Sequence, residues 1–360
     1  YLRRLVQQGY RVAICEQMED PSVAKGIVRR AVTETITPGA AFADDLLDGA
    51  RNNFLCAVRE SGGQVGIAAV DLSTGEFRLA ITLPGDAGAL LARLSPRELL
   101  VARDAPAVAG VTGGDGGTLL TERDGWEFDP SLARDDLARH FGVLSLDGLG
   151  LEADDDAAVA AAGALLRYLR ELQPAGVPHL ARPRIERAGG TMPLDEMTRR
   201  NLELVESLRG GGTAGTLLDV LDRTLTPMGA RLLRQWMLAP LLDVRRIRER
   251  LDAVTALVSD AIARTALRDA LDGVRDVERL ASKAASGRAT PRELRALGDS
   301  VSRLPDVEHA ARRVGDAAAV AVLLERWDAC ADLAASIVAT LVDRPPAALG
   351  DEETIARGVD

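Results

Sequence analysis

One segment defines the helical half of this chain: Leu221-Asp222-Arg223-Thr224-Leu225-Thr226-Pro227-Met228-Gly229-Ala230-Arg231-Leu232-Leu233-Arg234-Gln235-Trp236. Thr226 is a favourable N-cap residue, and Pro227 suits the first helical position because its missing N–H has no intrahelical partner there. Pro240 ends the helix. Large apolar residues three and four positions apart form one stripe on this helix, so we predict that the stripe is buried. The predicted core positions are Leu232, Leu233 and Trp236.

The region around this segment, residues 177–360, reads as almost wholly helical after a short strand at 184–187. Thr290-Pro291-Arg292-Glu293 combines a capping box with proline at the first helical position. A cluster of prolines at 174, 178 and 183 marks the start of the region. Long amphipathic patterns predict helices at 243–258, 290–304 and 317–342.

Residues 53–176 alternate strands and helices and predict a small α/β domain. Three strands separated by short Gly- and Ser-containing turns form a β-meander. The predicted strands are 53–59, 64–72, 76–82 and 98–102, and the predicted helices are 86–94, 130–141 and 155–171.

Residues 1–40 predict the end of a helix followed by strands at 11–16 and 28–36, and residues 41–52 a polar linker. The predicted organisation is therefore multidomain, an α/β part followed by an all-α part. Because Tyr1 opens within a helical pattern, we expect this chain to be a piece of a longer protein.

Composition excludes several classes of protein. The chain has 360 residues, enough for two to three domains, and 47% of them are hydrophobic. The longest apolar run, 157–166, is too short to span a membrane, and no signal peptide is evident. The three cysteines are far apart and form no CxxC pair, so neither a disulfide framework nor a zinc site is expected. These features favour a cytoplasmic protein.

Charge is distributed unevenly along the chain. Residues 41–176 carry eleven basic and twenty-two acidic side chains, whereas residues 1–40 carry six and four. The acidic block should repel a phosphate backbone, so any nucleic-acid contact is expected in the first block or on local basic faces of 177–360. Lys25, Arg29 and Arg30 form a basic cluster that is either a set of phosphate contacts or an ordinary solvated patch.

Asp71 ends the second meander strand and allows two interpretations. A metal-dependent nuclease of RNase H-like fold would place its first metal-binding carboxylate on such a strand, but it needs further carboxylates that converge on the same metals. Alternatively, Asp71 forms a turn with the Ser-Thr-Gly that follows. The candidate further carboxylates for such a metal site are Glu98, Glu122 and Asp136, which stand at no recognisable spacing from Asp71.

Nucleotide hydrolysis is not expected from this chain. A phosphate-binding loop requires Gly, four residues and then Gly-Lys-Ser/Thr. The chain has two lysines, Lys25 and Lys283, and neither lies in such a sequence. Among the arginines, Arg231 and Arg234 share a helix face, where we expect ion pairs with Asp222 or Glu203 more than DNA contacts.

Motifs in this order along the whole chain resemble the bacterial MutS family of DNA mismatch-repair proteins. The motifs are Gly9-Tyr10-Arg11-Val12-Ala13-Ile14-Cys15-Glu16-Gln17, Asp20-Pro21, Lys25-Gly26, Val28-Arg29-Arg30, Thr37-Pro38-Gly39, Met192-Pro193-Leu194-Asp195-Glu196-Met197-Thr198-Arg199-Arg200-Asn201-Leu202-Glu203-Leu204, the stretch 217–240, and the tail 344–360.

The resemblance implies four segments. Residues 1–40 would be the end of a mismatch-binding domain, 41–52 a linker, 53–176 an RNase H-like connector domain, and 177–360 the first part of a helical core or lever domain, truncated before the DNA clamp. Arg30 falls where the family has an arginine on the DNA backbone, with Lys25 and Arg29 as weaker candidates, and Leu232, Leu233 and Trp236 would hold the lever core.

The resemblance also implies cofactors and partners for the full-length protein: ATP and Mg²⁺, double-stranded mismatched DNA, a MutL-type mediator at the connector, and a homodimer. It would be a DNA-dependent ATPase associated with the nucleoid. This segment would transmit changes between the DNA and the ATPase. A MutS-like scaffold for recombination and the nuclease centred on Asp71 remain as alternatives.

Overall fold

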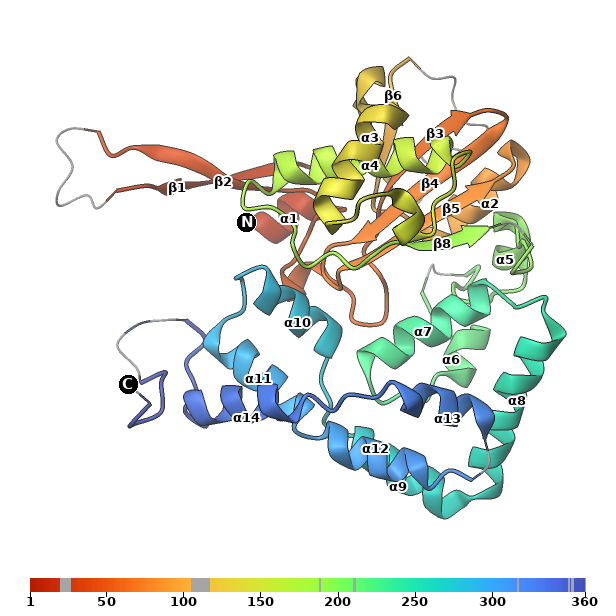
Figure 1. The fold of residues 1–360 in the computed structure, drawn as a ribbon, viewed down its shortest axis with the longest axis vertical. Helices are drawn as coiled ribbons and strands as arrows, with labels where there is room; N and C mark the ends of the chain where they lie inside the picture. Colours follow the sequence, from red (N-terminus) through yellow and green to blue (C-terminus); the bar gives the residue numbers. More distant parts are fainter. Residues whose placement is uncertain are drawn as a thin grey trace. The chain divides into compact units, whose positions relative to one another are not determined.

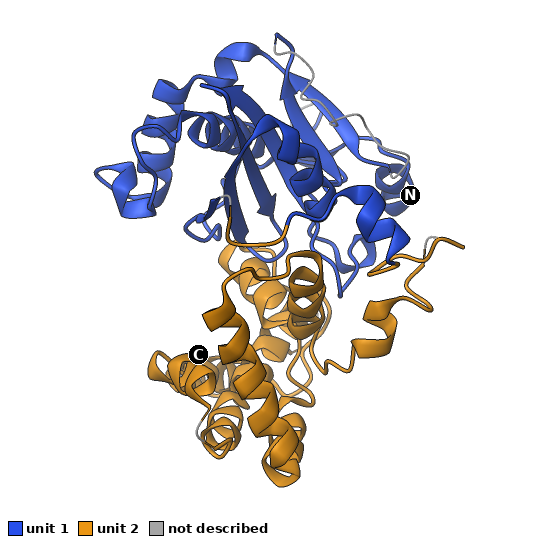
Figure 2. Ribbon diagram, turned by 90° about the vertical axis from the view of Figure 1, so that its right-hand side faces the viewer, with its two compact units in different colours: residues 1–188, 193–202 blue, residues 189–192, 203–360 orange. Residues whose placement is uncertain are grey.

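The computed structural model describes residues 1–19, 27–104, 117–187, 189–209, 212–315, 317–348, 350 and 353–359. The chain divides into two compact units, coloured separately in Figure 2. The first unit contains residues 1–188 and 193–202, and the second contains residues 189–192 and 203–360. The coarse prediction of a mixed α/β part and a helical part is confirmed, and the units are described in turn.

The first unit is built on a six-stranded mixed sheet of order β7-β6-β3-β4-β5-β8. The antiparallel meander is β3 (Leu55–Ser61), β4 (Gln64–Asp71) and β5 (Glu76–Thr82). Gly62 and Gly63 both have positive φ, as a tight two-residue hairpin turn requires. Three further strands extend the meander at its two edges, each pairing in parallel with its neighbour: β6 (Glu98–Ala102), β7 (Leu119–Arg123) and β8 (Arg184–Arg187).

Helices cover both faces of this sheet (Figure 1). The hydrophobic core on one face of the sheet includes α3 (Pro130–Phe141) and α4 (Asp156–Leu172). The hydrophobic core on the other face includes α2 (Pro84–Leu94). The apolar run 157–166 lies in α4 and is entirely buried, which makes it a core helix. β4 and α4 touch at their backbones, because a Cβ added to Gly66 would lie 2.1 Å from the carbonyl carbon of Ala157.

The N-terminal segment contains α1 (Leu2–Gln7) and a hairpin of β1 (Val12–Gln17) and β2 (Arg30–Ile36). Figure 1 shows the hairpin extending away from the sheet of the same unit. Residues 41–52 are not simply a polar linker, since Ala41 and Phe42 are buried and Phe42 belongs to the core beneath α4. A short 3₁₀ helix, η1 (Asp44–Leu46), follows them.

The boundary predicted at residue 177 is too early. β8 pairs in parallel with β5, and Val177 and Leu180 belong to the core beneath α4. The first unit therefore runs on to the end of this strand, because pairing with the sheet edge satisfies the backbone of β8. It also contains two 3₁₀ helices and the short helix α5 after β8. These elements are η2 (Gly125–Phe128), η3 (Leu146–Leu149) and α5 (Glu196–Asn201).

The described part of the second unit is helical, and most of its helices begin at a polar cap. The side chains of Asp243, Asp260 and Asp276 each accept a hydrogen bond from a backbone N–H of the first turn. The predicted capping box of Thr290 and Glu293 is confirmed. The helices are α6 (Leu217–Leu221), α7 (Pro227–Leu238), α8 (Val244–Ser259), α9 (Ala261–Leu271), α10 (Val277–Ala285), α11 (Pro291–Val301), α12 (Leu304–Arg312), α13 (Ala318–Glu325) and α14 (Ala331–Thr340).

The single helix predicted at 317–342 is wrong, since α13 and α14 are separate. Cys330 has a φ of 48°, and its N–H donates to Asp328 Oδ1 at 2.8 Å. A left-handed residue cannot continue an α-helix, so the chain turns there. The predicted helix from 290 to 304 also ends early, at Val301, and α12 begins at Leu304.

The predicted burial of the α7 stripe is largely wrong. Leu232 is 47% exposed and Trp236 is 42% exposed, while Leu233 is partly buried. The buried residues of α7 are instead Ala230, Arg231 and Leu238, on another face of the helix. The Trp236 ring is covered on one side by the Arg250 guanidinium of α8, 3.7 Å from the ring centroid.

Among the residues that the structure describes, no helix combines the length and the apolar character needed to cross a membrane.

Candidate nucleic-acid interface

The β1–β2 hairpin presents two arginines at the end far from the rest of its unit. Arg30 begins β2 opposite Gln17, and the Arg29 N–H donates to Glu19 Oε1 at 2.7 Å. Both arginine side chains are exposed, and neither has an ion-pair partner within the described part of the chain. Free guanidinium groups are well suited to phosphate oxygens, which they bind through paired N–H donors. Lys25, the third predicted member of the cluster, lies outside the described residues.

The other end of the hairpin is tied to the sheet by a polar network. Arg11, just before β1, donates to Thr121 Oγ1 at 2.7 Å, and Thr121 donates to Glu98 Oε1 at 2.8 Å. Tyr168 of α4 donates to the same carboxylate oxygen at 2.6 Å. Glu98 and Tyr168 are fully buried. This network was not predicted, because its members are distant in sequence and no local motif links them.

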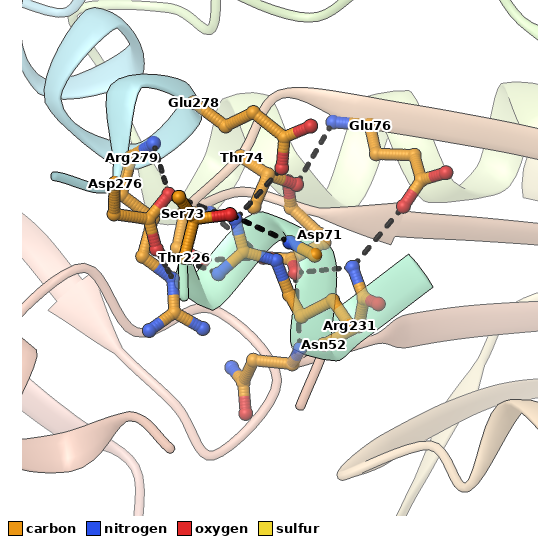
Figure 3. Close-up of polar contacts among 12 residues, drawn as sticks. Asn52, Asp71, Ser73, Thr74, Glu76, Thr226, Arg231, Asp276, Glu278 and Arg279 are labelled. Atoms are coloured by element: carbon orange, nitrogen blue, oxygen red, sulfur yellow. Dashed lines mark hydrogen bonds and ion pairs between the residues drawn. The ribbon is translucent and has the colours of Figure 1, made fainter. Parts of the chain in front are cut away.

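Asp71 is a buried hydrogen-bond acceptor. Its Oδ1 accepts from the N–H and the hydroxyl of Ser73, at 3.0 and 2.7 Å. Its Oδ2 accepts from Asn52 Nδ2 at 3.0 Å (Figure 3). The same oxygen accepts from the Asn53 N–H at 3.1 Å. Its backbone carbonyl also accepts from the Gly75 N–H. Two of these four donors belong to Ser73 and close the turn after β4, as the turn-forming interpretation predicts. The other two, from Asn52 and Asn53, tie this turn to the segment before β3.

The carboxylates proposed as metal partners of Asp71 are engaged elsewhere. Glu98 accepts from Thr121 and Tyr168, Glu122 faces Arg103 at 3.8 Å, and Asp136 pairs with Arg167 at 2.8 Å. Among the described residues, no three acidic, histidine or cysteine side chains are arranged to hold a metal ion. The geometry therefore does not favour a two-metal nuclease centre.

In the second unit, Arg231 makes a different ion pair from the one predicted. Its guanidinium donates to both oxygens of Asp276, at 2.6 and 2.8 Å, and to Glu278 at 2.7 Å (Figure 3). These bonds join α7 to the start of α10. They also raise the pKa of Arg231, outweighing the opposing effect of its burial.

The predicted partners have local roles instead. Asp222 accepts from the N–H and hydroxyl of Thr224, and Glu203 accepts from the Leu208 N–H. Arg234 lies 3.6 Å from Glu206.

Lys283 has a structural role. It is buried in α10 and donates to Glu293 Oε1 at 2.6 Å, while Glu293 Oε2 accepts from the Thr290 N–H. Burial alone would raise the pKa of Glu293, but the hydrogen bonds from Lys283 and Thr290 lower it below its usual value.

Comparison with known proteins finds three matching family domains in chain order. MutS domain I matches residues 1–45, MutS domain II matches 53–181, and MutS domain III matches 197–357. These boundaries place residues 177–181 with the second domain, as the sheet does.

Curated relatives are similar over nearly all of the chain. The DNA mismatch repair protein MutS of Solibacter usitatus is 43% identical over 99% of this chain and 42% of the relative. That of Symbiobacterium thermophilum is 43% identical over 97% of this chain and 40% of the relative. That of Myxococcus xanthus is 40% identical over 99% and 40%. The chain therefore spans about two fifths of the length of these relatives.

Proposed function

Because this chain belongs to the MutS family of DNA mismatch-repair proteins, we propose that its β1–β2 hairpin contacts the backbone of mismatched duplex DNA through Arg30 and Arg29. The observation that carries the proposal is the pair of exposed guanidinium groups at the far end of the hairpin. Such contacts position a protein on DNA without reading its sequence. Lys25 belongs to the same proposal on the basis of the sequence.

We further propose that the first unit acts as an RNase H-like connector and the second as a lever. An antiparallel meander, extended by parallel strands and covered by helices on both faces, supports the first role. Helices joined by ion pairs of the buried side chains Arg231 and Lys283 support the second, because packed elements move as units. In this proposal the complete protein is a homodimer that binds and hydrolyses ATP with Mg²⁺ and engages a MutL-type mediator through the connector.

The test of the DNA contact is Arg30→Ala in the complete protein, with Arg182→Ala as the control. Arg182 is also exposed but lies outside the hairpin. Loss of one phosphate contact should weaken binding to all duplexes alike and reduce the magnitude of the salt slope by about one. Unchanged affinity and slope would show that Arg30 is a solvated surface residue.

Two competing functions give different results in the same assays. A recombination scaffold would bind matched and mismatched duplexes equally well. A nuclease centred on Asp71 would lose Mg²⁺-dependent cleavage when Asp71 is replaced by Asn, whereas we expect this substitution to leave nucleic-acid activity intact. The saturated hydrogen bonding of the Asp71 carboxylate is the reason for that expectation.

A further inference from the structure

The two chain segments at the base of the β1–β2 hairpin, one before β1 and one after β2, both contact one buried side chain, Glu98. Before β1, Arg11 reaches Glu98 through the Thr121 hydroxyl, with donor–acceptor distances of 2.7 and 2.8 Å. After β2, Gly39 packs so closely that an added Cβ would lie 2.7 Å from Glu98 Cβ. The two strands of the hairpin are thus anchored at a single point of the sheet.

A third element holds Glu98 from the helix side. The Tyr168 hydroxyl of α4 donates to Glu98 Oε1 at 2.6 Å. The guanidinium groups of Arg11 and Arg123 lie 5.7 and 5.1 Å from the centroid of the Tyr168 ring. Arg123 is in turn held by Glu127 and Glu171.

The protonation state of Tyr168 suits this role. Burial and the neighbouring Glu98 carboxylate raise the pKa of the Tyr168 hydroxyl, so it remains a hydrogen-bond donor. Glu98 Oε2 is buried without a hydrogen-bond partner among the described residues. The carboxylate therefore depends on the donors at its other oxygen, and loss of that acceptor would leave the two buried hydroxyls of Thr121 and Tyr168 without it.

Because the hairpin is long, a small change of angle at its base moves its far end by a large distance. A strand of six residues, such as β1, is about 20 Å long at about 3.3 Å per residue, so a tilt of about 10° at the base displaces the far end by about 3.5 Å. That displacement exceeds the range over which a guanidinium–phosphate hydrogen bond survives. The orientation of the base thus determines whether Arg29 and Arg30 meet the DNA backbone.

We propose that Glu98, held by Arg11 and Tyr168, is a positioning joint that fixes the hairpin in the orientation needed for phosphate contact. This inference rests on the proposed DNA contact of Arg30, but the joint itself is measurable without DNA. Glu98 and Tyr168 touch no DNA in this proposal and act through the hairpin.

The direct test is a pulsed electron paramagnetic resonance distance measurement in the complete protein. Spin labels are placed on Cys15, exposed on β1, and on an Asp135→Cys substitution, exposed on α3, with other accessible cysteines replaced by serine. Glu98→Met removes the acceptor and should broaden the distance distribution. Glu98→Gln keeps an acceptor oxygen for Tyr168 and should leave the distribution narrow.

Arg11→Met is the second variant, because Arg11 lies at the surface and its replacement should not prevent folding. Its control is Arg103→Met, which removes an exposed arginine that pairs with Asp124 at 2.7 Å away from the hairpin. Broadening with Arg11→Met but not with Arg103→Met supports the joint. Narrow distributions in both Glu98→Met and Arg11→Met would overturn it.

Binding of duplex DNA separates this inference from the proposed function. If about one tenth to one third of the hairpin orientations in Arg11→Met are competent, the Kd rises about three- to tenfold. The salt slope should stay unchanged, because no phosphate contact is removed. A broadened distance distribution with unchanged DNA affinity would support the joint and refute the DNA role of the hairpin. A salt slope of smaller magnitude in Arg11→Met would show that Arg11 itself contacts DNA and would refute its positioning role.

Discussion

The ion pair between Arg231 and Asp276 should couple α7 to α10 strongly enough to be measured. Arg231 is 2% exposed and donates to both Asp276 oxygens and to Glu278. Removing one partner of a buried pair costs about 3–5 kcal/mol. Arg231→Met should lie near the lower limit, about 3 kcal/mol, because Asp276 is partly exposed and still accepts from the Arg279 N–H.

Asp276→Asn should cost less, about 2 kcal/mol, because Glu278 remains to pair with Arg231 and asparagine can still cap α10. In the double variant neither residue of the pair is left as an unpaired charge. Its loss of unfolding free energy should therefore be smaller than the sum of the two single losses by about 1–2 kcal/mol.

The assay is urea unfolding of the two single variants and the double variant, followed by tryptophan fluorescence. All variants carry Trp126→Phe and Trp327→Phe, so that Trp236 on α7 reports on this part of the fold. Arg312→Met, which removes an exposed pair with Glu308 on one helix, is the control and should cost under about 1 kcal/mol. A coupling energy below about 0.5 kcal/mol, or an Arg231→Met cost no larger than that of the control, would refute the reasoning.

Three further predictions concern the first unit. Gly66→Ala should cost at least about 3 kcal/mol or abolish folding, because the added methyl group meets the α4 backbone; thermal unfolding measures it, and a melting temperature within a few degrees of the wild type would contradict it. Asp71→Ala should cost about 2–3 kcal/mol in urea unfolding, because it leaves the buried N–H of Asn53 without its acceptor, and a neutral result would show that the turn does not depend on the carboxylate. Burial alone would raise the pKa of Asp155, but the Arg187 guanidinium and a backbone N–H lower it below its usual value, so the stability from this pair is present above about pH 4 and is lost as the pH falls through the folded pKa. Arg187→Met should therefore lower the free energy of unfolding at pH 7 and have a shrinking effect below about pH 4, and an effect that grows on acidification would refute this sign.

Much of the secondary structure follows from local signals. Thr226-Pro227 and the capping box at Thr290 predict the starts of α7 and α11, because cap and proline preferences depend on the residues of a single turn. The meander strands follow from the short Gly- and Ser-containing turns between them, such as the turn at Gly62-Gly63.

The candidate DNA contacts also came from sequence, through the resemblance of residues 9–39 to one family. The exposure of Arg29 and Arg30 agrees with that hypothesis, and their contact with DNA stays a prediction.

Only the tertiary structure decided which face of α7 is buried and which groups pair across distance. The apolar stripe of Leu232 and Trp236 predicts a buried face, yet the buried face of α7 is another one, which carries Arg231, because Asp276, 45 residues away, supplies a carboxylate that pairs with the buried guanidinium. Arg11 and Thr121 are 110 residues apart. Helix caps and turns depend on neighbours within a few residues, whereas the partner of a charged side chain depends on the path of the whole chain, and a sequence with 44 basic and 54 acidic residues offers many alternatives.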